Sequence, residues 1–588
     1  TKNKALQWLY NETDFNNEYI IEEISEEMKE FRDITTKFVE QEISPIENRL
    51  EGKEEGLMRQ VMEKAGNLGL LGVSIPEKYN GSGKNLLYNS IVGEAIGKGY
   101  GSFTVSFSAH TSIGTNPILL FGTPEQIEKY IPKLASGEYI GAYGLTEPGS
   151  GSDALSGKTT AVLSPDGKHY ILNGQKCWIT NGGFADIFTV FAKIDGVHFT
   201  SFIVEKGIAG FTHGVEEHKL GIKGSSTVQL YFQDCKIPKE NVLGEIGQGH
   251  KIAFNILNSG RVKLGVGCLG AAKKGLLTAL EYAQNRIQFK QPIANFGAIK
   301  QKFSDMLIHI WLLESISYRT VGNIEEAHRL FEAEGKNFAE AELAAFEAFA
   351  TECSIVKVFG SETLHNVLDE CLQIHGGNGF SDEYLISRAF RDQRINRIFE
   401  GTNEINRLLV LDMILKRALS GKIELLPAIK KVQKDLLDIP DFQQSPNFDN
   451  GFEYLPQYLA NFKKLMLIVA GAAAQKFEQK LAQEQELILC IVQIIMDVYI
   501  CESGLVRLQK LNSKGKNTTI QMAMLQTFFY DQSFKIAKAA QDAITYFSEG
   551  DEQKMLLLAT KRFTKTHFVN TIALRKEIVS DFYEKKTV

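Results

Sequence analysis

Apolar residues recur every three or four positions along much of the first 140 residues, and this spacing predicts helices. Ile24, Met28 and Phe31 fall on one face of such a helix. Another helix is expected to begin after Thr123, because threonine is a favourable cap and a proline occupies the first helical position. We therefore expect residues 1–140 to form an N-terminal α-helical domain.

Residues 141–249 show a different pattern, in which short apolar runs typical of β-strands alternate with turn residues. The runs are TTAVL, HYILNG, DIFTVFAKI, FTSFIV and TVQLYF. Turn-forming pairs lie at 166–167 (DG), 173–174 (NG) and 195–196 (DG), and such pairs favour hairpins. This region is therefore predicted to be a small middle domain with an antiparallel sheet.

Helical spacing returns near residue 250 and continues to the end of the sequence. We expect one very long helix over 250–286, within a helical bundle that spans residues 250–418. A proline-containing linker with an amphipathic segment follows at 419–453, and residues 454–588 are predicted to be an additional C-terminal α-helical domain. The predicted fold class is mainly α with a β domain (α+β).

Two apolar segments raise the question of membrane contact. Residues 421–440 carry an apolar face that can rest on a membrane surface or on protein, and their mixed basic and acidic residues favour protein. Residues 487–501 form the most apolar stretch, but Gln493 and Asp497 interrupt it. A buried helix is therefore expected there rather than a membrane span.

The composition limits the possible functions. The chain has 588 residues, of which 44% are hydrophobic, so several units with buried cores are expected. Its net charge of −6 argues against nucleic-acid binding, which needs a basic surface. The seven cysteines show no zinc-site spacing, so no metal site is expected and a reducing compartment is favoured.

Two stretches in the predicted β domain have residues that suit a flat or anionic ligand. The loop YGLTEPGSGSDA (143–154) combines hydroxyls at Thr146 and Ser152 with glycines that expose backbone N–H groups, although a surface turn explains it equally well. Trp178 and Thr180 lie two residues apart at the end of a strand, so both can face the same ring. A core position for Trp178 is the simpler alternative.

Two stretches in the predicted bundle stand out. Arg286 ends the long helix, where a cation favours the helix dipole and where a guanidinium can also bind pyrophosphate. The stretch CLQIHGGNGF (371–380) has three glycines, and a helix cap explains only one of them. We interpret its His375 as structural. The arginines between these glycines and the next motif are expected to form ion pairs; they are Arg388, Arg391, Arg394 and Arg397.

The stretch RIFEGTNEI (397–405) places one carboxylate, Glu400, between apolar Ile398 and Phe399 and a turn. Thr402 is the predicted cap of a helix that begins at Asn403, so Glu400 lies before the helix and is free for another role. The residues expected on the buried side of that helix are Ile405, Leu408 and Leu409.

Together, and in this order around an α–β–α layout, these stretches resemble the acyl-CoA dehydrogenase family over residues 30–415. The helical region after residue 420 is similar to the second helical domain of the very-long-chain branch. The resemblance implies an acyl-CoA dehydrogenase fold, an FAD cofactor and the oxidation of a long- or very-long-chain acyl-CoA to trans-2-enoyl-CoA in fatty-acid β-oxidation.

The resemblance also implies roles for individual residues, with Glu400 as the catalytic base. The implied FAD contacts are Tyr143, Leu145, Thr146, Gly151, Ser152, Trp178, Thr180, Thr402, Asn403 and Glu404. Contacts with the FAD of a neighbouring subunit are implied for Arg286, Phe289, Gln373, Gly376 and Gly377. The implied substrate contacts are Ser152, Asn258, Arg261 and Gly401, and Asn258 stands where some members carry aspartate.

The implied chemistry is consistent with these residue types. A carboxylate in an apolar pocket has a raised pKa and can remove the α-proton of a thioester, and we expect Ile398 and Phe399 to form that pocket. In the family, the backbone N–H of the base and a ribityl hydroxyl of the flavin polarise the thioester carbonyl, and hydride passes from Cβ to flavin N5. Ser106, Ser108, Ala109 and Ser112 are small enough to leave room for a long tail, although helix packing uses small residues too.

The expected partners are the acyl-CoA, electron-transferring flavoprotein and a second subunit in a homodimer. A bacterial cytoplasm is favoured, and the mitochondrial matrix or inner-membrane face is the eukaryotic alternative. Two other functions remain open: an acyl-CoA oxidase that uses O₂, and a dehydrogenase-like assembly or scaffold protein that acts through residues 454–588.

Overall fold

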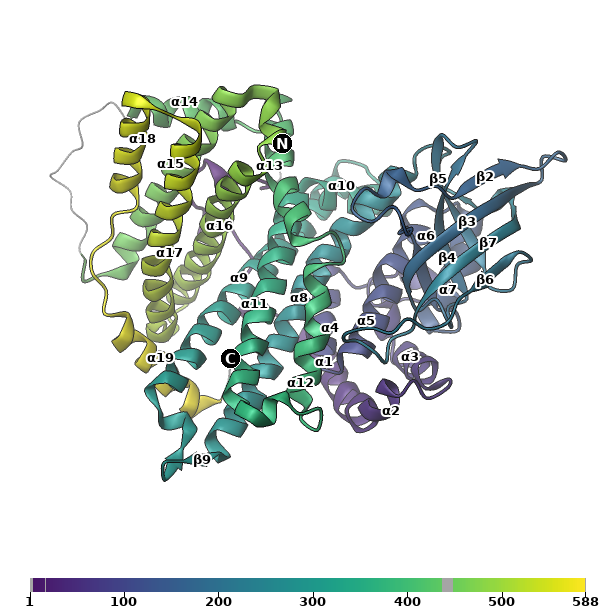
Figure 1. Cartoon of the computed structure of the whole chain (residues 1–588), viewed down its shortest axis with the longest axis horizontal. Helices are drawn as coiled ribbons and strands as arrows, with labels where there is room; N and C mark the ends of the chain where they lie inside the picture. Colours follow the sequence, from purple (N-terminus) through teal and green to yellow (C-terminus); the bar gives the residue numbers. More distant parts are fainter. Residues whose placement is uncertain (1–3, 16, 436–447, 587–588) are drawn as a thin grey trace.

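The computed structural model describes residues 4–15, 17–435 and 448–586. A long central helical bundle separates a sheet domain from a group of C-terminal helices (Figure 1). The predicted fold class is confirmed, since helices dominate and one sheet domain lies between two helical regions.

The N-terminal helices lie beside the sheet and the bundle. They are α1 (Glu26–Phe38), α2 (Glu47–Glu51), α3 (Leu57–Asn67), α4 (Leu86–Gly97), α5 (Gly101–Ala109), α6 (Asn116–Phe121) and α7 (Pro124–Ser136). The predicted cap of α7 is present, because the Thr123 hydroxyl accepts the backbone N–H of Gln126 and the Gln126 side chain accepts that of Thr123.

The residues before α1, which the predicted N-terminal domain includes, also contact the bundle. The indole of Trp8 and the backbone N–H of Leu6 donate to the buried carboxylate of Glu352 in the bundle, each at 2.9 Å. Glu18 forms a buried ion pair with Arg319. These hydrogen bonds and this ion pair attach the segment to the bundle.

The middle domain contains one eight-stranded sheet in the order β6-β7-β3-β2-β4-β5-β8, with β1 beside β4. Its strands are β1 (Gly141–Gly144), β2 (Thr160–Leu163), β3 (His169–Thr180), β4 (Ile187–Ile194), β5 (His198–Glu205), β6 (Phe211–His213), β7 (Thr227–Pro238) and β8 (Val242–Leu243).

The sheet differs from the prediction in two respects. Most strand pairs are antiparallel, but β4 pairs in parallel with both β1 and β2, so the sheet is mixed. The DG pairs at 166–167 and 195–196 do connect antiparallel strands. The NG pair at 173–174 is not a turn: it lies within β3 at a register shift, where Gly174 has φ 147° and faces Thr159 too closely for a Cβ atom.

The bundle begins with the predicted long helix, α8 (Gly249–Asn285), which ends in the small hairpin of β9 (Ile287–Gln288) and β10 (Gln291–Pro292). The rest of the bundle comprises α9 (Gly297–Ala333), α10 (Phe338–Ala348), α11 (Ala350–His375), α12 (Leu385–Gln393) and α13 (Asn403–Leu419). Then come α14 (Leu425–Asp435), α15 (Gly451–Phe477), α16 (Gln485–Ser513), α17 (Thr519–Phe547), α18 (Gly550–Phe563) and α19 (Thr571–Lys585). We call α15–α19 the added domain.

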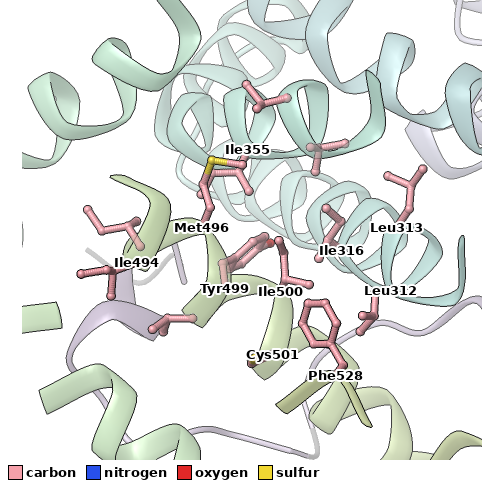
Figure 2. Close-up of a cluster of buried hydrophobic side chains, with 14 of the residues drawn as sticks. Leu312, Leu313, Ile316, Ile355, Ile494, Met496, Tyr499, Ile500, Cys501 and Phe528 are labelled. Atoms are coloured by element: carbon pink, nitrogen blue, oxygen red, sulfur yellow. The ribbon is translucent and has the colours of Figure 1, made fainter. Parts of the chain in front are cut away.

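The added domain and the bundle share one apolar core, in which α16 packs against α9, α11 and α17 (Figure 2). Ile316, Ile355, Tyr499, Ile500 and Phe528 are all buried there. The helix α16 is long and apolar enough to cross a membrane, but 83% of its most apolar window is buried inside the protein. The prediction of a buried helix over 487–501 is therefore confirmed.

The apolar face of the amphipathic helix α14 rests on protein over its described length. Leu425, Ile429 and Val432 are buried, and Ile429 lies against Gly471 of α15 so closely that a Cβ there would be 2.6 Å from its methyl group. The end of the predicted 421–440 segment, from residue 436, lies outside the described residues.

Candidate active site

Glu400 lies in a tight turn between a short 3₁₀ helix, η12 (Arg394–Arg397), and α13. Its φ is 57° and that of Gly401 is 82°, so two consecutive residues are in the left-handed region. This conformation is strained for a glutamate, at about 1–3 kcal/mol, and such strain is typical of functional sites. It also places the carboxylate before the helix, as the sequence predicts, while Thr402 accepts the Ile405 N–H at 3.2 Å and caps α13.

Three side chains hold the carbonyl groups of this turn. The Asn406 amide donates to the carbonyls of residues 400, 401 and 402, at 3.3, 2.8 and 3.0 Å. Arg261 Nε donates to the Glu400 carbonyl at 3.3 Å, and Lys357 Nζ donates to the Gly401 carbonyl at 2.8 Å. These bonds fix the backbone at the position of the carboxylate.

The predicted orientation of α13 is wrong. Ile405, Leu408 and Leu409 are only partly buried, and the polar residues Asn403 and Asn406 face inward instead. Both amides bind groups of the turn or of α11. The same face of α13 buries the apolar residues Val410, Leu411 and Ile414, which lie further along the helix. Asn406 and Lys357 were not predicted as site residues, although a lone lysine among apolar residues in CSIVKV is a detectable signal.

The Glu400 carboxyl is surrounded by protein, and its burial raises its pKa to about 7. The charges of Arg261 and Lys357 oppose this rise. Its Oε2 has no hydrogen-bond partner in the described part of the chain. That oxygen faces Gly260, where a Cβ atom would lie only 2.7 Å away. The carboxyl thus has the properties of a desolvated base.

The expected apolar flanks are only half present. Phe399 lines the cavity in front of Glu400, whereas Ile398 is 49% exposed and points away from the interior. The desolvation of the carboxyl comes instead from the close approach of α8 at Gly260 and from the buried ring of Tyr143 on β1, whose pKa is raised by burial and by the charge of Glu400.

A cavity of about 240 Å³ leads away from Glu400. It runs along α8 from Gly260 to Thr278, between that helix, α5 and α12. On α8 the wall combines small residues with the longer side chains of Lys263, Leu264 and Lys274. A Cβ atom at Gly267 would meet open space. Among the small residues predicted near the pocket, Ser108, Ala109 and Ser112 line the cavity, whereas Ser106 is buried and does not.

The loop 143–154 lies where β1 ends. Tyr143 is buried, and its hydroxyl has no hydrogen-bond partner among the described residues. The Leu145 carbonyl accepts from Lys176 Nζ at 3.3 Å, and that of Thr146 accepts the Cys177 N–H at 2.9 Å, so the loop is tied to β3. The exposed part of the loop contains Gly151 and Ser152.

A buried ion pair beneath this loop was not predicted. Lys176 and Glu147 are 1% and 7% exposed, and their charged groups are 2.6 Å apart. Burial alone would raise the pKa of Glu147, but the Lys176 ammonium and the N–H groups of residues 158 and 159 lower it below its usual value. Burial also lowers the pKa of Lys176, and the charge of Glu147 opposes that shift. The ion pair connects the loop to β3.

Trp178 and Thr180 do not follow simple strand alternation. Trp178 has φ 61° and lies at a register shift of β3, so the argument from strand sides does not apply to it. Trp178 is 60% exposed, which also excludes a core role, and Thr180 lines the cavity. An exposed tryptophan two residues before a cavity-lining threonine is typical of a ligand-binding surface.

The five residues predicted to reach a neighbouring subunit all lie on the surface, far from Glu400 of the same chain. Arg286 is 26 residues beyond Gly260, or about 39 Å along α8. Phe289 at the tip of the hairpin is 87% exposed. Gln373, Gly376 and Gly377 are exposed at the end of α11. His375 is structural as interpreted, since it is buried, binds the Cys371 carbonyl and stacks on Tyr282.

The remaining predicted contacts are directed partly toward protein. The Asn258 side-chain oxygen accepts from Arg261 at 2.9 Å, and Arg261 holds the Glu400 carbonyl. The Asn403 amide is used by Lys357 and α11, so only its backbone is available to a ligand. Glu404 is exposed in the first turn of α13.

The four arginines before the turn differ from one another. Arg388 pairs with Glu47, and Arg391 pairs with Asp382 at 2.6 Å, as predicted. Arg394 and Arg397 form no ion pair within the described residues, and each has a buried guanidinium nitrogen without a hydrogen-bond partner. The prediction is therefore wrong for these two.

We predict that Glu147→Met lowers the free energy of unfolding by about 3–5 kcal/mol, because it leaves the Lys176 ammonium buried and unpaired. The double variant Glu147→Met/Lys176→Met should recover most of the loss. Urea unfolding monitored by circular dichroism measures the free energy of unfolding of the single and the double variant. Asp542→Met, in an exposed pair on α17, is the control and should change stability by less than about 1 kcal/mol. Equal effects of Glu147→Met and Asp542→Met would contradict the structural role of the buried pair.

Family models match the chain in four segments. The acyl-CoA dehydrogenase N-terminal domain matches residues 25–138 and the middle domain matches residues 142–235. Two models, each described as an acyl-CoA dehydrogenase C-terminal domain, match residues 247–415 and 461–562. The last segment lies within the added domain.

Similar proteins occur in bacteria and mitochondria. A probable acyl-CoA dehydrogenase of Bacillus subtilis (strain 168) is 42% identical over 579 residues, which are 98% of this chain and 97% of that protein. The very long-chain specific acyl-CoA dehydrogenase, mitochondrial, of Homo sapiens is 42% identical over 400 residues, which are 66% of this chain and 58% of the human protein.

The fold matches a solved structure over almost its whole length. The crystal structure of an acyl-CoA dehydrogenase complexed with FAD from Bacillus anthracis superposes with a TM-score of 0.95 at 42% identity, and covers 99% of this chain and 100% of that one. Since the family models and these relatives cover the buried glutamate, the cavity and the added domain alike, the chain belongs to the acyl-CoA dehydrogenase family.

Proposed function

We propose that this acyl-CoA dehydrogenase oxidises the Cα–Cβ bond of long- or very-long-chain acyl-CoA, with Glu400 as the base that removes the α-proton. The observation that carries the proposal is the unpartnered Glu400 carboxyl oxygen, buried at the head of a long cavity with a pKa near neutrality. A carboxylate with these properties is matched to proton abstraction at physiological pH.

The residues around the cavity fit FAD. The Tyr143 hydroxyl is buried without a partner in the described residues. Thr180 lines the cavity, and Trp178, two residues before it, is largely exposed. The N-terminus of α13, with Thr402 and Glu404, adds backbone N–H groups that favour a polar ligand. FAD, when bound, supplies the acceptor for the hydride that leaves Cβ.

The protein contributes positioning and desolvation to the reaction. The carbonyl bonds of Asn406, Arg261 and Lys357 hold Glu400 in its strained conformation, so the carboxylate needs no reorganisation before it accepts the α-proton. The backbone N–H of Glu400 donates to no group in the described part of the chain and can therefore polarise the thioester carbonyl. Phe399 and Gly260 limit the access of water.

The shape of the cavity supports a long acyl chain. It follows α8 over 18 residues, which correspond to about 27 Å of helix. Gly267 leaves open space in the wall at roughly 10 Å from Gly260. A short acyl group would fill only the beginning of such a cavity.

The proposal includes a homodimer, an electron acceptor and a compartment. The surface positions of Arg286, Phe289 and Gln373 support a role at the active site of a second subunit, since these residues are too distant to reach the active site of their own chain.

We propose electron-transferring flavoprotein as the electron acceptor. A solved structure titled for the electron transferring flavoprotein of Acidaminococcus fermentans matches this chain with a TM-score of 0.58 at 35% identity. The Bacillus relatives support a bacterial cytoplasm.

We predict that anaerobic hexadecanoyl-CoA removes the visible flavin absorbance of the purified protein. Glu400→Gln should keep its yellow colour and bind the ligand but bleach far more slowly. The rate constant should fall by at least about 100-fold, because the base is lost without a change of shape. Stopped-flow absorbance measures the rate constant. Glu334→Gln, at an exposed position at the end of α9 and outside the cavity, tests whether the loss is specific to residue 400.

Other outcomes would overturn the proposal. Normal bleaching by Glu400→Gln would exclude this residue as the base. Stoichiometric H₂O₂ from the wild-type protein in air would indicate an oxidase. A protein that stays colourless with added FAD would indicate the scaffold function.

We predict that Gly267→Leu shifts the substrate preference toward short chains. The new side chain would enter the open part of the cavity and block a chain that extends beyond about 10 Å from Gly260. The ratio of kcat/KM for hexadecanoyl-CoA to that for butanoyl-CoA should fall by at least about tenfold. Gly93→Leu on α4 is the control, because a Cβ there also meets open space but does not line the cavity. An unchanged ratio in Gly267→Leu would contradict the assignment of the cavity to the acyl chain.

A further inference from the structure

The catalytic turn is connected to α11 through the Asn403 side chain. Lys357 Nζ donates to the Gly401 carbonyl at 2.8 Å and to the Asn403 side-chain oxygen at 2.7 Å. The Asn403 amide nitrogen in turn donates to Ser361 Oγ at 3.0 Å and to Glu362 Oε1 at 3.1 Å. Asn403 and Lys357 are 2% and 0% exposed, so the position of the ammonium depends on the amide beside it.

From Glu362 the hydrogen bonds continue into the added domain. Arg407, one turn after Asn403 on α13, binds both carboxylate oxygens of Glu362, at 3.2 and 2.9 Å. Its other terminal nitrogen donates to Gln493 Oε1 of α16 at 2.9 Å. The Gln493 amide donates to Asp497 Oδ1, also at 2.9 Å. An unbroken series of side-chain hydrogen bonds therefore joins α16 to the turn that carries Glu400.

The far end of this series is rigidly held. Asp497 is 3% exposed, and it sits on the helix whose other side chains form the apolar core shared with α9 and α11 (Figure 2). Interiors packed in this way resist displacement. Gln493 is consequently fixed relative to the bundle, and its oxygen gives the Arg407 guanidinium one preferred position.

We infer that the added domain positions the catalytic turn, with Gln493 and Arg407 as positioning residues that act through Glu362, Asn403 and Lys357. The expected effect on the rate of flavin bleaching rests on the proposed function, whereas the hydrogen-bonded connection between α16 and the turn does not. Arg407 is suited to this role because its planar guanidinium binds a carboxylate with two bonds and an amide with a third.

The connection also has an electrostatic consequence for Glu400. The charged and titratable groups that act on its carboxyl are Arg261 from α8, Lys357 from α11 and Tyr143 from β1. Loss of the Asn403–Glu362 geometry would release Lys357 from its position near the turn. The base would then be further from a positive charge and would need a higher pH to ionise.

Hydrogen exchange tests the mechanical part without any catalytic assay. In Gln493→Leu, the backbone amides of residues 400–409 should exchange at least about tenfold faster than in wild type, because a hydrogen bond to a charged group is lost. Gln509→Leu, on the same helix but outside the series, should leave that exchange unchanged. Equal exchange of residues 400–409 in the two variants would overturn the inference.

Kinetics test the functional part. In Arg407→Met, hexadecanoyl-CoA should still bind, but the rate constant of flavin bleaching should fall by at least about tenfold and its pH dependence should shift to higher pH. Arg407→Lys should recover less than half of the rate, since lysine cannot bind Glu362 and Gln493 together. Wild-type rate and pH profile in Arg407→Met would overturn the functional part. Failure of the wild-type protein to bleach would instead reject the proposed function, and the hydrogen-exchange result would still decide the connection.

Discussion

The desolvation of one carboxyl group, Glu400, is the constraint on which the rest of the site depends. A buried carboxylate is unstable without compensation, and here it is neither paired nor fully hydrogen-bonded among the described residues. The protein compensates at the backbone, where Asn406, Arg261 and Lys357 bind the carbonyls of the turn. Burial raises the pKa of Glu400, and the positive charges of Arg261 and Lys357 limit this rise, so that the pKa is about 7.

The layers of the fold explain why such a turn can exist. The sheet domain contributes Tyr143, the long helix α8 contributes Gly260 and Arg261, and α11 contributes Lys357. Each reaches the turn from a separate element, so water is excluded from several directions at once. The added domain stands behind α13, and its shared core with the bundle restricts movement of that helix.

Local features of the site were predictable from the sequence, and long-range ones were not. Thr402 is recognisable as a cap because its partner is three residues away. The buried pair Glu147–Lys176 joins residues 29 apart and has no local signature. The Asn-Gly pair at 173–174 was misread because the same residues suit a β-bulge inside a long strand. Asn406 was not predicted because the buried side of α13 was inferred from the spacing of apolar residues, and this spacing gives no information about an amide that binds the carbonyls of a turn.

The most direct test of this account is the pH dependence of kcat/KM for hexadecanoyl-CoA, measured with an artificial electron acceptor. This parameter reports the ionisation of groups in the free enzyme. Because the proton acceptor must be ionised and burial raises the pKa of Glu400 to about 7, kcat/KM should rise with pH and level off above an apparent pKa near 7. A profile that is flat from pH 5.5 to pH 8.5, as expected for an ordinary exposed carboxylate, would contradict the claim that Glu400 is a desolvated base.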